Sequence, residues 1–383
     1  MFMAGRIQFG PGVSSKAGDL VRGTGAKSAL IVTDETMERL GVAERIAEAV
    51  RKGGVEVSVF SKVEPEPSVE TTDEAAKIAR GMNAGAVIGL GGGSSMDVAK
   101  AVAVLVNNEG SASNYQGLGL VKKPGVPKIM IPTTSGTGSE VTFTAVLIRK
   151  SDGVKGGINS DFLYPDLSLL DPELTVSMPP HVTASTGMDA LAHALEAYTS
   201  LQASPFSDMF AEEAMWRVGK WLRVATLNGR NLEARSEMML AALYGGVALA
   251  NAGVTACHAL AYPLGGMFGV PHGTANALLL PHVARWNALA SPARFAQAAS
   301  LLGYVQEEGV PDHVAAMFCS EALDDLLNDL GLPAMLQDLK VGIGEENLEE
   351  MATKAMGVSR PMENNPRVMT KSDCIKIYRE AMM

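Results

Sequence analysis

Residues 86–106 read AVIGLGGGSSMDVAKAVAVLV: a short apolar run, three glycines and a longer segment of helix-forming residues. The apolar run predicts a buried strand, and the segment from Ser94 to Val106 predicts a helix. Similar pairs occur on either side. Strands are predicted at residues 28–34, 55–60, 127–132 and 166–172, and helices at residues 36–51 and 69–82. This alternation indicates βαβ units and a mostly parallel sheet covered by helices on both faces.

The pattern changes in the middle of the chain. Short runs on either side of an SDG turn, between Val141 and Ile158, predict a hairpin. From Pro180 onward, strand signals nearly vanish, and long segments rich in Ala, Leu and Met are separated by Gly, Pro and Asn. We therefore predict an α/β domain over residues 1–179 and an all-helical domain over residues 180–383.

The bulk composition excludes several classes of protein. The chain has 383 residues and a formal net charge of −10, so it carries no electrostatic footprint for nucleic acid or an anionic membrane. Its start lacks the apolar core of a secretory signal. The most apolar stretch, residues 238–254, contains two glycines and an asparagine, which indicates a buried helix and no membrane span. Three scattered cysteines favour the reducing cytoplasm.

Two blocks of the helical half carry candidate metal ligands. In GMDALAHALEAY, Asp189 and His193 are four residues apart, and side chains at this spacing share one face of a helix. In HALAYPLGGMFGVPHG, we expect His258 near the end of a helix. A Pro/Gly-rich turn over residues 263–271 would then break the helix and bring His272 beside His258. Three imidazoles and one carboxylate suit Fe(II) or Zn(II), with coordination positions left for water or substrate.

The alternative interpretation is that these histidines are structural, as isolated histidines commonly are. Three of the six histidines nevertheless occur in two short blocks with a carboxylate at helical spacing, which keeps the metal site open as a hypothesis. Cys257 adjoins His258, but neighbours on a helix point in different directions, so we expect Cys257 to pack in the core. The remaining histidines are predicted to be structural or surface residues: His181, His282 and His313.

Two polar loops and one acidic residue follow predicted strands and are candidates for binding a nucleotide. In the first loop, three glycines let the backbone approach a ligand closely, and the N–H groups at the start of the following helix can bind a phosphate. The alternative is that the glycines only form a tight turn between strand and helix. Serines there can cap the helix or donate to the phosphate. At the end of the first strand, Asp34 suits ribose hydroxyls and disfavours a 2′-phosphate, with a helix N-cap as the alternative. The candidates are Asp34, Gly91, Gly92, Gly93, Ser94, Ser95 and Asp97, followed by Thr133, Thr134, Thr137 and Ser139 in PTTSGTGSE.

Together these blocks resemble the iron-dependent (group III) alcohol dehydrogenases, over essentially the whole chain. The resemblance is carried by GGGSSMDVAK, PTTSGTGSE, LYPDLSLLDPEL, MPPHVTASTGMDALAHALEAYTS, CHALAYPLGGMFGVPHGTANALLLPHV and NNPRVMTKSDCIKIY. It implies a Rossmann-like, dehydroquinate-synthase-like α/β domain and an all-helical domain, with NAD(P) and a catalytic divalent metal between them. It also implies homodimers or larger homo-oligomers in the cytoplasm.

The resemblance assigns roles to individual residues. Metal ligation falls on Asp189, His193, His258 and His272, and cofactor binding falls on Asp34, the Gly91–Ser95 turn, Thr133, Thr134, Thr137 and Lys155. One position departs from the pattern, because many members have a histidine four residues after the third ligand, where this chain has Tyr262. With an ordinary pKa of about 10, a tyrosine is a poorer base than histidine at neutral pH. The Tyr-Pro pair resembles the branch acting on 4-hydroxybutyrate and related hydroxy acids.

The implied reaction is reversible oxidation of a primary alcohol or a short hydroxy acid to the aldehyde by NAD. The metal would act as a Lewis acid on the substrate oxygen while hydride passes to the nicotinamide. Tyr262 and His272 are the predicted catalytic residues, since the proton can leave through Tyr262, the surroundings of His272 or the ribose hydroxyls. Two alternatives stay open. One is a sugar-phosphate cyclase or lyase of the dehydroquinate-synthase type, although basic residues are scarce around His258. The other is a non-enzymatic binding module.

Overall fold

The fold was obtained as a computed structural model, and residues 3–304 and 309–382 are described here. The chain forms two compact units. An α/β unit contains residues 3–134 and 138–177, and a helical unit contains residues 135–137, 178–304 and 309–382. The chain passes into the helical unit between Ser177 and Met178, close to the predicted boundary at residue 180.

The α/β unit is built on a parallel sheet of six strands in the order β1-β9-β6-β4-β2-β3. Their bounds are Arg6–Phe9 (β1), Ser28–Val32 (β2), Glu56–Phe60 (β3), Ala86–Gly91 (β4), Lys128–Pro132 (β6) and Leu167–Leu170 (β9). The strands β4 and β6 are buried along their whole length, because helices cover the sheet on both faces. The predicted parallel sheet is confirmed.

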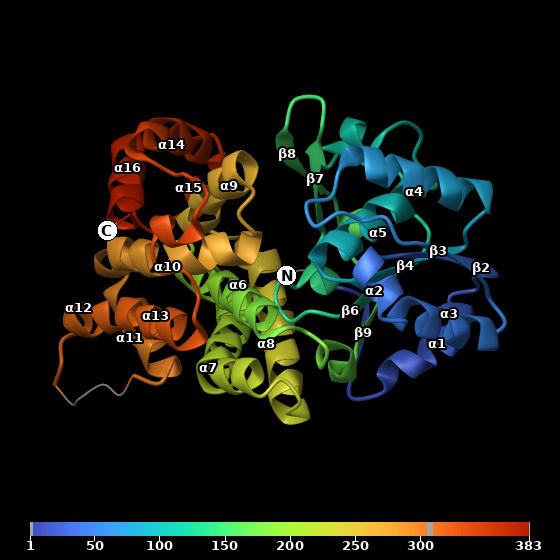
Figure 1. The fold of residues 1–383 in the computed structure, drawn as a ribbon, viewed down its shortest axis with the longest axis horizontal. Helices are drawn as coiled ribbons and strands as arrows, with labels where there is room; N and C mark the ends of the chain where they lie inside the picture. Colours follow the sequence, from blue (N-terminus) through green and yellow to red (C-terminus); the bar gives the residue numbers. More distant parts are fainter. Residues whose placement is uncertain (1–2, 305–308, 383) are drawn as a thin grey trace. The chain divides into compact units, whose positions relative to one another are not determined.

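Alternate residues of the central strands β2, β4 and β6 enter two separate cores. Leu30 and Val32 of β2 pack with α4 and α5, whereas Ala29 and Ile31 pack with α1 and α3. Figure 1 shows these helix pairs on opposite faces of the sheet. The two-residue period of a strand thus produces three layers. The helices of this unit span Ala17–Gly23 (α1), Glu35–Arg39 (α2), Val42–Lys52 (α3), Val69–Gly81 (α4) and Gly93–Leu105 (α5).

Two local features of this unit bear on the sequence predictions. The helix predicted over residues 36–51 is wrong as a single element, because Gly41 adopts a left-handed conformation (φ 70°) and separates α2 from α3. The predicted hairpin is confirmed, with β7 (Thr144–Arg149) antiparallel to β8 (Val154–Asn159). Both belong to a second sheet, completed by β5 (Gly117–Leu118).

The helical unit contains no strand within its described residues. Its central helix α6 is buried nearly all round from Met188 to Thr199, as expected of an apolar helix enclosed by others. The helices are α6 (Pro180–Thr199), α7 (Pro205–Leu227), α8 (Leu232–Ala252), α9 (Ala256–Phe268), α10 (His272–Asn287), α11 (Pro292–Leu301), α12 (Asp312–Ala315), α13 (Met317–Leu330), α14 (Leu348–Met356), α15 (Ser359–Asn364) and α16 (Lys371–Glu380).

No single helix among the described residues combines the length and apolar character needed to cross a membrane. The pair α8 and α9 meets the criterion by length and composition only when taken together, across a bend of 106°.

Candidate metal centre and cofactor loops

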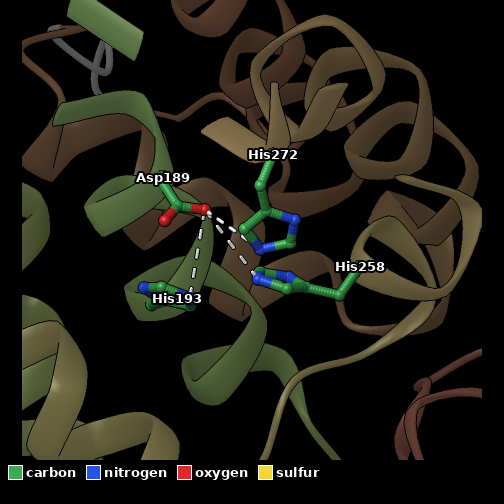
Figure 2. A group of neighbouring side chains, drawn as sticks. All are labelled: Asp189, His193, His258 and His272. Atoms are coloured by element: carbon green, nitrogen blue, oxygen red, sulfur yellow. Dashed lines mark ion pairs between the residues drawn. The ribbon is translucent and has the colours of Figure 1, made fainter. Parts of the chain in front are cut away.

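Helix α6 carries the first half of the metal centre. Asp189 and His193 are four residues apart on this helix, and both are almost completely buried, with 2% and 5% of their surface exposed. The two side chains therefore project from one face toward the same point (Figure 2).

The second half comes from α9 and α10. The expected position of His258 near the end of a helix is wrong, because this residue lies in the first turn of α9. The helix also continues through Pro263 to Phe268. Its residues from Ala256 to Leu264 are buried, apart from Tyr262. Packing of these residues outweighs the low helix propensity of proline. The actual turn is short, with Gly269 left-handed (φ 69°), and His272 begins α10.

The four side chains converge on a common centre, as Figure 2 shows. One ligand atom from each lies within 4.8 Å of the others. Asp189 Oδ1 is 3.9 Å from the Nε2 atoms of His193 and His258 and 3.8 Å from Nε2 of His272. Bonds of about 2.0–2.2 Å to one ion would place neighbouring ligand atoms about 3.3–3.6 Å apart, so small side-chain shifts would bring these atoms onto a common ion. The donor set fits Fe(II) or Zn(II).

Burial and neighbouring groups shift the pKa values of two candidate ligands, Asp189 and His193. Burial opposes ionisation of Asp189, but the three histidines and the Asn276 amide lower its pKa below the ordinary value. Burial lowers the pKa of His193, although Asp189 acts in the opposite direction. A neutral imidazole and an ionised carboxylate are the ligand forms that metal binding requires.

Two residues at the centre were not predicted from the sequence. Asn276, four residues after His272 on α10, is fully buried. Its Nδ2 donates to Asp189 Oδ1 at 2.8 Å and lies 3.2 Å from Nε2 of both His258 and His272. Glu196, three residues after His193, contacts Nδ1 of His258. In the sequence, each of the two is a polar residue in an otherwise apolar helix, three or four residues after a candidate ligand. That position could have marked them as neighbours of the metal centre.

Tyr262, the predicted catalytic phenol, lies on α9 beside the centre. Its ring is stacked on that of His272, with ring centroids 6.0 Å apart and an interplanar angle of 26°. The His272 side chain is 30% exposed, whereas the other three ligand side chains are at most 6% exposed. The structure therefore places Tyr262 next to the most accessible ligand.

In the α/β unit, three of the predicted cofactor segments follow neighbouring strands. Asp34 comes after β2, the Gly91–Ser95 turn begins at the last residue of β4, and Thr133 comes after β6. Strand β4 pairs with both β2 and β6. Strands β2 and β4 are neighbours, with β3 on the other side of β2 and β6 on the other side of β4. The strand order therefore reverses between β2 and β4. Ligands of doubly wound sheets bind at the carboxyl ends of the strands at such a reversal.

The side chains in these segments make specific contacts. Asp34 caps α2 by accepting N–H bonds from Thr36 and Met37, which is the alternative role considered for it, and it also accepts from Ser95 Oγ at 3.3 Å. The predicted capping of α5 by serine is wrong, because Gly92 occupies the N-cap position and Ser94 Oγ donates to Pro65 O.

Glycine at position 91 is required by its conformation. It adopts φ 141°, and a Cβ at this position would lie 2.7 Å from Ser95 Oγ. The start of α5 can therefore approach an anion closely.

The remaining predicted cofactor residues differ in their surroundings. Lys155 on β8 pairs with Glu66 at 2.6 Å. Thr134 follows Thr133, and Thr137 belongs to residues 135–137 of the helical unit. There, a Cβ on Gly136 would lie 2.7 Å from Cβ of Thr186, which shows how closely this segment packs on α6.

Asp97 and Ser139 are engaged in a buried network with Lys100. Asp97 accepts from Ser139 Oγ at 2.6 Å and from the Val146 N–H at 2.9 Å, and it pairs with Lys100 at 3.0 Å. Burial raises the pKa of nearby Glu140 to about 7, although Lys100 opposes the shift. The network joins the glycine loop's helix to the second polar loop.

A doubly wound α/β unit and a helical unit with a cluster of three histidines and an aspartate are typical of an enzyme that uses a nucleotide and a metal ion. Residues 4–172 match the family described as iron-containing alcohol dehydrogenase, and residues 183–382 match the C-terminal part of the Fe-containing alcohol dehydrogenase family. The chain belongs to the iron-containing alcohol dehydrogenase family.

Individual relatives match over nearly the full length. The chain is 40% identical to long-chain-alcohol dehydrogenase 1 of Geobacillus thermodenitrificans over 364 residues, covering 94% of this chain and 91% of the relative. It is 36% identical to the NAD-dependent methanol dehydrogenase of Bacillus methanolicus over 373 residues, covering 97% of each. A crystal structure of 1,3-propanediol oxidoreductase superposes with a TM-score of 0.96 at 36% identity, covering 100% of this chain and 99% of that one.

These matches confirm the predicted family, fold class and enzyme class. The chain is an NAD-linked alcohol dehydrogenase of the iron type, and nothing in the comparisons favours the sugar-phosphate cyclase.

Proposed function

We propose that the protein transfers hydride reversibly between a primary alcohol, or a short hydroxy acid such as 4-hydroxybutyrate, and NAD to give the aldehyde. The observation that carries this proposal is the convergence of Asp189, His193, His258 and His272 in one buried cluster. Three histidines and a carboxylate, with one ligand partly exposed, fit a catalytic metal site that has room for substrate.

In this proposal the four ligands hold Fe(II) or Zn(II), which when bound supplies Lewis-acid polarisation of the substrate oxygen. The exposed side of His272 admits the alcohol. Tyr262, stacked on His272, donates a hydrogen bond to the substrate or relays its proton, and its phenol replaces the histidine of other members. The side chain also contributes to the choice between simple alcohols and hydroxy acids.

NAD supplies the hydride acceptor, and the chain orients it. We assign its phosphates to the Gly91–Ser95 turn at the start of α5 and its ribose to Asp34, whose carboxylate disfavours a 2′-phosphate. The hydroxyls of Thr133, Thr134 and Thr137 and the ammonium group of Lys155 complete the proposed cofactor site. Asp97 and Ser139 contribute by holding the two loops together through their hydrogen bond.

The proposed setting is the cytoplasm, with the protein as a homodimer or larger homo-oligomer. The net charge of −10 and the three free cysteines support this setting. The proposed partners are small alcohols and aldehydes, with no nucleic acid or membrane.

The test compares His258→Ala with His313→Ala, the same change at an exposed histidine outside the cluster. Metal-free protein is reconstituted with Fe(II) or Zn(II), and NADH formation is followed with a panel of short-chain alcohols and 4-hydroxybutyrate. We expect metal-dependent turnover in the parent and the His313 variant, and loss of metal and turnover in the His258 variant. Normal metal content and full activity in His258→Ala would refute the assignment.

A further inference from the structure

Glu196 is a buried carboxylate that lies next to the metal centre without being one of its ligands. It is only 2% exposed and extends from α6 toward the first turn of α9. A charged side chain in such a position is strongly destabilising unless its oxygens are fully hydrogen-bonded. Its partners therefore indicate why α6 contains a glutamate here.

The first carboxylate oxygen binds the start of α9. Oε1 accepts from the backbone N–H groups of Thr255 at 3.0 Å, Cys257 at 2.9 Å and His258 at 3.3 Å, and from Thr255 Oγ1 at 2.8 Å. Thr255 occupies the N-cap position but forms no side-chain cap of its own. Glu196 thus acts as the cap from another helix, where a negative charge also interacts favourably with the helix dipole.

The second oxygen binds the ring of a metal ligand. Oε2 is in hydrogen-bonding contact with Nδ1 of His258. A carboxylate accepts only, so the proton of the neutral ring lies on Nδ1 and the lone pair on Nε2. The surroundings of Nε2 are compatible with this tautomer, because the Asn276 Nδ2 group, which donates to Asp189, lies 3.2 Å away and can donate to a lone pair there.

We propose that Glu196 is a positioning residue that fixes the orientation and tautomer of His258 and joins α6 to α9, so that the four ligands are assembled before the metal binds. This inference rests on the proposed metal-dependent function. It predicts that Glu196 controls metal affinity although it does not contact the metal.

Glu196→Gln has nearly the same shape and separates positioning from packing. If the amide oxygen keeps the donors of the α9 start, the NH₂ group faces His258 Nδ1, and the ring proton must move to Nε2. The opposite orientation places the NH₂ group against backbone N–H donors. Either arrangement weakens the site, and changes of this kind reduce metal affinity by about 10–100-fold.

The measurement is the Kd for Zn(II), by competition with a chelator, together with melting temperatures of the metal-free and metal-loaded protein. We expect Kd to rise at least about tenfold in Glu196→Gln and less in Glu196→Asp, which keeps the charge. Glu140→Gln, the same change at a buried glutamate of the α/β unit, should leave Kd unchanged. Thr255→Val, which removes one donor to Oε1, should lower the metal-free melting temperature and leave Kd within about threefold.

An unchanged Kd in Glu196→Gln, with equal melting shifts in both forms, would overturn the inference and leave the metal function intact. A parent protein that binds neither Fe(II) nor Zn(II) would instead refute the proposed function. Nitrogen-15 spectra of the histidines in the metal-free parent give a second test that needs no variant. They should show His258 protonated at Nδ1, and a proton on Nε2 would overturn the proposal.

Discussion

Lys100 provides a quantitative test of how the two candidate cofactor loops are held together. Its ammonium group is completely buried and pairs with Asp97 at 3.0 Å. It donates to Ser139 O at 3.1 Å, to Thr142 Oγ1 at 3.3 Å and to Thr144 O. Burial lowers the pKa of Lys100, and Asp97 opposes this shift. Lys100→Met fills much of the same volume but removes the cation.

Removing one partner of a buried ion pair destabilises a protein by about 3–5 kcal/mol. Asp97 keeps its bonds from Ser139 Oγ and the Val146 N–H, and its side chain is 15% exposed, so we expect the low end, about 3 kcal/mol. The unfolding of two units is not a single transition, so the assay is local hydrogen exchange. A loss of 3 kcal/mol accelerates exchange of the Val146 amide by about 100-fold.

The control is Lys77→Met, the same change at an exposed position of α4, which should leave the exchange unaltered. The double variant Lys100→Met with Asp97→Asn removes both charges. The stability lost by the double variant should be smaller than the sum of the stabilities lost by the two single variants, by about 1 kcal/mol or more. If the Val146 amide of Lys100→Met exchanges as slowly as that of the parent, the stabilising role assigned to Lys100 is refuted.

Three further predictions concern single residues. Gly91→Ala should destabilise the protein by about 1–3 kcal/mol and weaken NAD binding, because of the positive φ and the contact with Ser95. The control Gly23→Ala, in helix α1 where a Cβ meets nothing within 4 Å, should not lower the melting temperature and should leave the NAD titration unchanged. Burial, with a nearby arginine, lowers the pKa of His282 to about 4. The folded protein therefore binds fewer protons than the unfolded chain between pH 6.5 and 4. Its free energy of unfolding should fall by about 3 kcal/mol over that range. His282→Gln should remove this loss in acid unfolding curves, and an unchanged pH dependence would contradict the assignment. Tyr262→Phe should reduce kcat by about 100-fold or more with an unchanged metal Kd if the phenol relays the proton, and unaltered kcat would exclude that role.

The sequence predicts the sheet well for a simple physical reason. Strands buried on both faces are continuous apolar runs, and β4 and β6 are of this kind. The break between α2 and α3 at Gly41 could not be predicted from such patterns, because helix-forming residues occur on both sides of this single glycine. The continuation of α9 through Pro263 is equally hidden, since it depends on packing against residues distant in the chain.

The metal ligands are accessible to sequence reasoning because their chemistry and spacing are local. The spacing of Asp189 and His193 alone places them on one helix face. Glu196 and Asn276 are different, because a buried polar residue has meaning only through its partners. The partners of Glu196 lie some sixty residues further along the chain. No local pattern encodes that pairing.

The ligands come from α6, α9 and α10, so a bound ion ties together points of the chain that are far apart in sequence. Because the unfolded chain does not present the assembled site, the ion would have to be released before the long segment between Asp189 and His272 could unfold. The cysteines of this chain are all buried and free, and none provides a covalent link of this kind. If the four residues bind metal as proposed, the resistance of the helical unit to unfolding, and hence to proteolysis, should rise with the concentration of free metal.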